Sequence, residues 1–240
     1  MPRERWRKRR FFRAKFFFFA ILFLAAALLG GAVYALRYPG WQIQTVLVFG
    51  FDETMHADVE ARVRESLDAR FAFILPKSSY FLFDEGAVQK TLEKDFPWLH
   101  DITVKKEFPS MVSVVARERG LWAVFCDMNR TCGYMDKTGF IYEEAPVSTG
   151  ALIMTVETDE QEVHIPSQAF DPAFVQKLDS FVLLLGEKTG EDVETFLFSK
   201  EFPGEVRVRT RHGFLLYLDR DDDFGKVISI LRVFLEKEIG

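Results

Sequence analysis

The sequence has few of the residues from which catalytic and metal sites are usually built. The four histidines are scattered, and none has a second histidine or cysteine at metal-ligand spacing. They are His56, His100, His164 and His212. Surface or capping roles are therefore expected for them. Ser78, Ser79 and Ser110 lack the Gly-x-Ser-x-Gly context of a hydrolase nucleophile. The sequence predicts no enzyme, no cofactor and no metal site.

Cysteine is equally scarce. Only Cys126 and Cys132 occur, and the five residues between them include Asp127, Asn129 and Arg130, which suit a turn. We expect a disulfide across the two strands of one hairpin, which would stabilise the fold by about 2 kcal/mol in the chain-entropy model. Two free thiols are the alternative. A redox role is disfavoured because the Cys-x-x-Cys spacing is absent.

Internal repeats and low-complexity linkers are also missing, and a single long apolar run stands out. Residues 16–36, bounded by Phe16 and Leu36, contain no charged residue and lie between Lys15 and Arg37. As a helix, such a run is roughly 31 Å long at about 1.5 Å per residue, which matches the hydrocarbon core of a bilayer. It predicts one transmembrane helix. The roughly 200 residues that follow allow one large domain or two small ones.

The flanking charges predict the orientation of this helix. Residues 1–15 carry eight basic residues and one acid, a net charge of +7. The basic residues nearest the apolar run are Arg7, Lys8, Arg9, Arg10, Arg13 and Lys15. By the positive-inside rule, residues 1–15 form a cytoplasmic tail and the C-terminal part lies outside the plasma (inner) membrane. Because the whole chain carries −5, the remainder is near −12, opposite in sign to a nucleic-acid binder.

A cleaved signal peptide is the rival interpretation. Val33, Tyr34 and Ala35 resemble the small-residue pattern of a cleavage site. The apolar run is longer than the usual core of a signal peptide, about 7–15 residues, and this length favours an anchor. A basic, Phe-rich arm for nucleic acid is a further reading, but beside an apolar span the charges are better explained as a topology signal.

Residues 37–120 show the pattern of a small domain with helices on one face of a sheet. A strand is expected at residues 41–49 and a helix beginning near Asp52, with Val59, Val63 and Leu67 at helical spacing. An apolar connection follows at 71–83, then a helix from 84 or 85 to 95. Alternating apolar residues predict a hairpin of strands at 102–107 and 111–118.

Residues 121–240 change to short strands with two helices. Strands are expected at 121–126, 132–135, 140–142, 151–156, 193–198, 205–210 and 214–218. Asp171 and Pro172 begin a helix as cap and first-turn proline. Its expected buried stripe is Phe174, Leu178, Phe181, Val182 and Leu185. An amphipathic helix beginning near Phe224 closes the chain. The fold class is α+β, with a mostly antiparallel second domain.

Two further residue groups have a structural and a functional interpretation. Asp219, Asp221, Asp222 and Asp223 could hold calcium but lack the spacing and terminal glutamate of an EF-hand. Their place before the last helix favours a turn and a negative cap. Trp98, Trp122 and the many phenylalanines could form a carbohydrate platform, but their helix and strand spacing favours core positions.

Several short motifs in residues 96–142 resemble those of the FtsQ/DivIB family of bacterial cell-division proteins. They are Phe96-Pro97-Trp98, Phe108-Pro109, Glu118-Arg119, Tyr134-Met135-Asp136 and Gly139-Phe140, in that order. This passage is similar to the family's passage from its POTRA domain into its β domain. Gly120-Leu121 and Phe125 depart from the family's common proline and tryptophan. The resemblance implies a transmembrane helix at 16–36, a POTRA domain at 37–120 and a β domain at 121–240.

The resemblance also implies a function. Such a protein would be a non-enzymatic, single-pass scaffold at the division site that binds membrane proteins of the FtsB/FtsL type. Family members usually add one more strand after the last helix, where a partner is thought to bind, and this sequence stops at Gly240. Either the sequence is a fragment or the interface is built differently, and we expect the partner on a nearby exposed edge strand or on the final helix. The expected strand comprises Phe214, Leu215, Leu216, Tyr217 and Leu218.

The sequence leaves two alternative functions open. A POTRA-type export or chaperone module would bind many extended peptides weakly, whereas a scaffold would retain one membrane complex. An anchored cell-wall enzyme would require a cleft of convergent polar groups, which the sequence does not supply.

Overall fold

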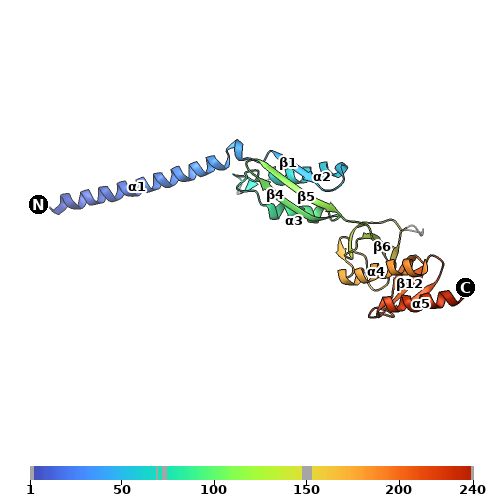
Figure 1. The fold of residues 1–240 in the computed structure, drawn as a ribbon. Helices are drawn as coiled ribbons and strands as arrows, with labels where there is room; N and C mark the ends of the chain where they lie inside the picture. Colours follow the sequence, from blue (N-terminus) through green and yellow to red (C-terminus); the bar gives the residue numbers. More distant parts are fainter. Residues whose placement is uncertain (1–2, 69, 72–74, 148–152, 239–240) are drawn as a thin grey trace. The chain divides into compact units, whose positions relative to one another are not determined.

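The computed structural model describes residues 3–68, 70–71, 75–147 and 153–238 (Figure 1). The chain divides into two compact units, Met1–Glu118 and Arg119–Gly240. Each unit has a hydrophobic core of its own. The α+β fold class is confirmed, with an apolar N-terminal helix, a first unit built on a three-stranded sheet and a second unit built on a larger sheet.

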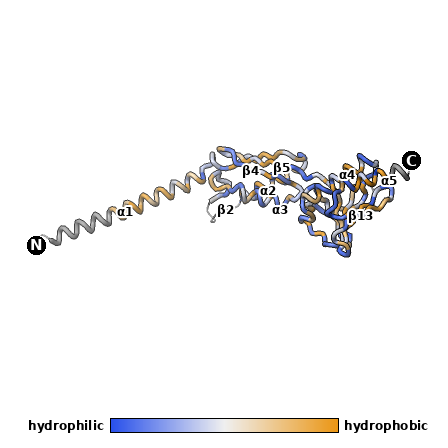
Figure 2. Tube along the Cα trace, turned by 60° about the horizontal axis from the view of Figure 1, so that its bottom comes forward, coloured by the Kyte–Doolittle hydropathy of each residue, from blue (hydrophilic) through white to orange (hydrophobic). Residues whose placement is uncertain are grey.

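The N-terminal helix α1 runs from Arg3 to Leu36 (Figure 1). It begins earlier than the predicted span because arginine and lysine are good helix formers and continue the helix. Its segment Phe17–Leu36 is the one helix in the described part of the chain that is long and apolar enough to cross a membrane. The apolar side chains there are exposed, as Phe23 is at 77%, and Figure 2 shows this segment largely in the hydrophobic colour.

The first unit contains a three-stranded sheet of order β1-β5-β4. Strand β1 (Thr45–Phe49) pairs in parallel with β5 (Met111–Glu118), and β5 pairs antiparallel with β4 (Leu99–Glu107). The predicted hairpin is confirmed. The predicted strand at 41–49 is too long, because Pro39 and Gly40 set a 3-10 turn at Pro39–Trp41 and regular pairing begins only at Thr45.

Helices α2 (His56–Asp68) and α3 (Glu85–Asp95) cover this sheet. A 3-10 turn at Glu53–Met55 precedes α2. Asp52 accepts a hydrogen bond from Thr54 N, and Asp84 caps α3 through Ala87 N. The buried residues of the two helices follow the predicted helical spacing: Val59, Val63, Leu67, Val88 and Leu92. Between the helices, β2 (Arg70–Phe71) and β3 (Leu75–Pro76) form a short pair that the sequence did not predict.

The second unit contains an eight-stranded sheet of order β10-β8-β7-β6-β9-β11-β12-β13. The strands are β6 (Ala123–Asp127), β7 (Cys132–Met135), β8 (Phe140–Glu144), β9 (Thr155–Thr158), β10 (Ser167–Gln168), β11 (Val193–Phe198), β12 (Glu205–Thr210) and β13 (Leu215–Asp219). Most neighbours are antiparallel, but β9 is parallel to both β6 and β11. The strand predicted at 151–156 is found at 155–158, and residues 151–152 lie outside the described residues.

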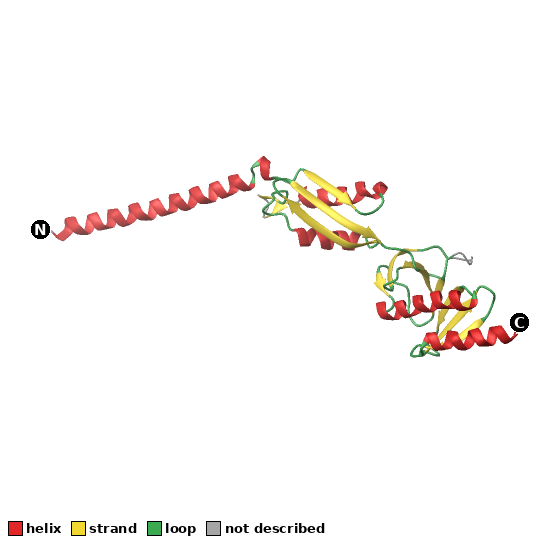
Figure 3. Cartoon of the chain, viewed as in Figure 1, coloured by secondary structure: helices red, strands yellow, loops and turns green. Residues whose placement is uncertain are grey.

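Helices α4 (Pro172–Thr189) and α5 (Phe224–Glu238) pack on the same core beneath this sheet. Figure 3 shows the two helices side by side against the strands. Phe181 and Phe224 meet edge to face with ring centroids 5.4 Å apart, which joins the helices through their apolar faces. The predicted stripe of α4 is correct for Leu178, Phe181 and Leu185, but the fully buried Val175 was missed.

Candidate partner-binding strand

Strand β13 is one of the two edge strands of the second sheet and, within the described part of the chain, pairs only with β12. The two strands form a hairpin whose register places Val208 opposite Leu216 and Arg207 opposite Tyr217. Gly213 closes the turn with φ 89°, a left-handed conformation that glycine adopts without steric cost. The predicted strand at 214–218 therefore exists, shifted by one residue to Leu215–Asp219.

The hydrogen-bond pattern shows which backbone groups of β13 face outward. Thr210 N donates to Phe214 O at 2.9 Å, and Arg220 N donates to Gly204 O at 2.8 Å. In an antiparallel pair, hydrogen-bonded and non-bonded residues alternate. Phe214, Leu216 and Leu218 therefore bond to β12. The backbone groups of the residues between them point to the open edge.

One end of this open edge is closed by a side chain. The outward N–H of Asp219 donates to Asp222 Oδ2 at 3.3 Å. The backbone N–H and C=O groups of Leu215 and Tyr217 point to the open edge. These two residues offer the pattern that an added strand requires.

The side chains of β13 are divided between the core and the open face of the sheet. Leu218 is 2% exposed and Leu216 packs on the same core. Leu215 and Tyr217 point to the other face and are 42% and 59% exposed, and Phe214 is 42% exposed. The edge thus offers outward N–H and C=O groups for hydrogen bonds to a partner strand, and exposed apolar side chains for the partner to cover.

Arg207 on β12 organises the open face beside this edge. Its guanidinium carbon lies 5.0 Å from the Phe202 ring centre and 5.6 Å from that of Tyr217. Its Nε donates to Glu205 Oε1, and this hydrogen bond is the largest of the causes that raise the pKa of Arg207. The cation thus lies within cation–π distance of both rings.

The open face is hollowed next to β13. The hollow has a volume of about 720 Å³ and is lined by residues that include Arg207, Arg209, Leu215, Glu157 and Asp159. Opposite charges and an apolar side chain on one surface suit a polypeptide, whose backbone and side chains can meet both.

The two cysteines lie along the same hollow and are joined. Cys126 and Cys132 face each other across β6 and β7, and the structure joins them by a disulfide with an S–S distance of 2.04 Å. Asp127 forms the turn between them by accepting from Asn129 N and Thr131 N. The bridge therefore closes a short, already ordered hairpin.

We expect that replacing both Cys126 and Cys132 by serine will lower the free energy of unfolding by about 2 kcal/mol, the loop-closure contribution for so short a loop. Denaturant unfolding of the oxidised chain and the variant measures this difference. Thiol titration of denatured, unreduced protein provides the control. Two free thiols in that titration would contradict the bridge.

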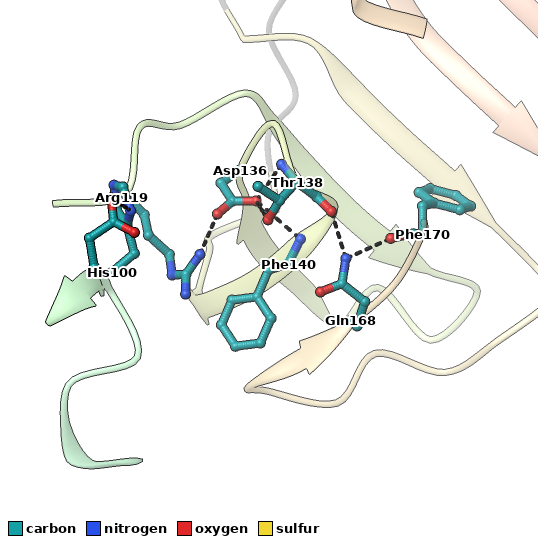
Figure 4. Close-up of polar contacts among 8 residues, drawn as sticks. His100, Arg119, Asp136, Thr138, Phe140, Gln168 and Phe170 are labelled. Carbon is teal, nitrogen blue, oxygen red and sulfur yellow. Dashed lines mark hydrogen bonds and ion pairs between the residues drawn. The ribbon is translucent and has the colours of Figure 1, made fainter. Parts of the chain in front are cut away.

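A buried ionic turn near the start of the second unit was not predicted as a functional feature (Figure 4). Asp136 is 6% exposed and accepts from Thr138 N at 2.7 Å and from Arg119 Nη1 at 2.6 Å. Arg119 also lies over the Phe140 ring, 4.3 Å from its centre. Gly139 has φ 79°, and a Cβ there would lie 2.6 Å from the Phe170 carbonyl oxygen. The motif residues Asp136, Gly139 and Phe140 thus form one turn, and the Arg119 side chain contacts it.

The environment of Asp136 favours its charged form. Burial alone raises the pKa of this carboxyl and is the largest single influence. Hydrogen bonds from Thr138, Arg119 and Phe140 together outweigh burial, so the pKa of Asp136 lies below its usual value. The sequence signal that could have revealed this turn is an aspartate two residues before a threonine and three before a glycine.

The remaining predicted residues are dispersed. In the acidic run, Asp223 accepts from Gly225 N at 3.1 Å at the start of α5, as expected for a cap. His212 Nδ1 lies 3.0 Å from Glu191 Oε2, and His56 Nε2 lies 3.1 Å from the Phe51 carbonyl oxygen. Across the described ranges, no group of three or more His, Cys, Asp or Glu side chains could hold a metal ion. The side chains of the basic residues at 7–15 lie outside the described residues.

Comparison with known proteins identifies the first unit. Residues 43–119 match the family model described as a POTRA domain, FtsQ-type. No curated protein matches the chain. The matched range covers β1, α2, α3, β4 and β5, and proteins with this domain are generally non-enzymatic and act through protein contacts. The chain thus contains an FtsQ-type POTRA domain that follows an N-terminal apolar helix, and this combination supports an FtsQ/DivIB-like protein.

Proposed function

We propose that the chain is a non-enzymatic, single-pass scaffold of the bacterial division septum. The observation that carries this proposal is the FtsQ-type POTRA domain at 43–119 behind an apolar helix long enough to span a bilayer. Eight basic residues before the span support a cytoplasmic N-terminus, with both folded units outside the membrane. The domains proposed are a tail at 1–15, a span at 16–36, a POTRA domain at 37–120 and a β domain at 121–240.

The partners we propose are membrane proteins of the FtsB/FtsL type, bound at β13. A partner strand placed beside β13 would meet the outward backbone groups of Leu215 and Tyr217. The exposed side chains of Phe214, Leu215 and Tyr217 would then be covered. The adjoining hollow extends this surface and offers both signs of charge. Backbone bonds would supply affinity, and the side chains would supply specificity.

Co-purification tests the proposal. The full-length chain is extracted from cells in detergent, and retained proteins are identified by mass spectrometry. Selective retention of division membrane proteins is expected. A full-length chain that retains none of them would contradict the scaffold.

The alternative function, binding of extended polypeptide by the POTRA unit, is favoured by one observation. Strand β1 is also an edge strand, and its Leu47 and Phe49 are 36% and 50% exposed. Such an edge could receive unfolded segments. Weak, similar binding of many unrelated peptides would favour this alternative over the scaffold.

A further inference from the structure

Five aromatic rings form a continuous series in the first unit, beside the end of α1. Ring centres are 5.5 Å apart for Tyr38 and Trp41, 5.4 Å for Trp41 and Phe81, 5.7 Å for Phe81 and Tyr80, and 5.6 Å for Tyr80 and Phe108. Each pair meets edge to face. We call these five residues the aromatic rim. They come from three separate segments of the chain, so the fold itself assembles the series.

Most of the rim is exposed. Tyr38, Phe81 and Phe108 are 47%, 55% and 65% exposed. Single exposed apolar residues are ordinary on a protein surface, but a connected group of them usually marks an interaction site. Tyrosine and tryptophan are enriched where a membrane meets water, because each combines an apolar ring with a polar tip. The composition of the rim therefore suits a lipid interface.

The chain connects the rim directly to the apolar helix. Tyr38 is the second residue after Leu36, the last residue of α1, so it lies at most about 7 Å of chain from the end of that helix. Tyr38 N donates to Ala35 O at 3.1 Å, and Tyr80 N donates to Trp41 O at 2.8 Å. These bonds tie the segment after the helix to the loop that carries Phe81.

We propose that the aromatic rim lies in the headgroup layer of the bilayer and seats the POTRA unit on the membrane surface. The proposal rests on α1 crossing the membrane, which is part of the function proposed above. Lys77 is exposed beside this loop, and Lys106 Nζ lies 5.3 Å from the Tyr80 ring centre. Cations close to the rings complement the phosphates of that layer. The rim would limit the tilting of the unit and thereby hold its open edges at a constant height.

Spin labels on the full-length chain in phosphatidylethanolamine and phosphatidylglycerol nanodiscs test this proposal. Phe81→Cys and Phe108→Cys each introduce a labelling site in the rim, since Cys126 and Cys132 are joined. Phe49→Cys is the matched control, because Phe49 is 50% exposed in the same unit but is outside the rim. Ala26→Cys reports on the span. Collision rates with oxygen, which enters lipid, and with a water-soluble nickel chelate are compared.

We expect an oxygen-to-nickel ratio at 81 and 108 that is several-fold higher than at 49. Equal ratios at positions 49, 81 and 108, with the label at 26 in lipid, would contradict the proposed location of the rim and would leave the proposed membrane span unaffected. Labels at 81 and 108 that are shielded from both reagents would show a protein cover and would also contradict that location. Exposure of the label at 26 to nickel would refute the span and the rim together.

Discussion

Tyr217→Pro is expected to reduce retention of division membrane proteins by at least about tenfold, equivalent to about 1.4 kcal/mol. Proline removes the outward N–H of β13 and places a ring where the partner strand would lie. The bonds from β13 to β12 do not use this N–H, because Leu216 and Leu218 make them. Proline is tolerated at edge positions whose N–H faces solvent. The variant should therefore stay folded, which circular dichroism can check.

Two matched variants show whether the loss of retention comes from the missing backbone N–H or from the missing side chain. Tyr217→Ala removes the ring but keeps the N–H, so it should weaken retention less than Tyr217→Pro does. Leu216→Pro removes a bond within the sheet and should destabilise the second unit, visible as a lower melting temperature. Full retention of partners by folded Tyr217→Pro would exclude strand addition at β13.

Asp136→Ala is expected to lower the free energy of unfolding of the second unit by about 1–3 kcal/mol, because it removes a buried carboxylate that accepts a hydrogen bond from the partly exposed Arg119 guanidinium. It also removes the acceptor for Thr138 and Phe140. Denaturant unfolding measures the change. Lys137→Ala is the control, since its exposed pair with Asp179 should contribute only about 0–1 kcal/mol. A change below about 1 kcal/mol for Asp136→Ala would contradict this account.

The same carboxyl predicts a pH dependence. The folded pKa of Asp136 is depressed, whereas its unfolded pKa is near 3.9. Its contribution to stability is therefore fully present above about pH 4 and is lost as the pH falls through the folded pKa. The free energy of unfolding should decrease less between pH 6 and pH 3 in Asp136→Asn than in the natural chain. Equal decreases in the two proteins would show that the pKa of Asp136 is not lowered in the folded chain.

The helices and the first unit were predicted well because their signals are local. Val59, Val63 and Leu67 repeat at helical spacing, and the aspartates that cap α3 and α4 stand directly before them. Strand pairing is not local. The position of β9 between β6 and β11, and the two-residue β10, depend on contacts between distant segments that periodicity does not encode.

Only part of the candidate site was predicted, because strand order depends on contacts between distant segments. The strand at 214–218 was visible as an apolar run, but its place at the edge of the sheet follows only from the order of all eight strands. The contact between Arg119 and Asp136 joins two motif residues that the sequence showed separately. This contact became apparent only in the fold.

The claim that β13 receives the partner is tested most directly by crosslinking in growing cells. A photoactivatable amino acid replaces Tyr217 in the full-length chain, and Phe49 and Leu183, which are 50% and 61% exposed, are replaced in control variants. The account predicts a crosslink to a division membrane protein from position 217 and none from positions 49 and 183. Crosslinks to that protein from position 49 or 183 alone would contradict it.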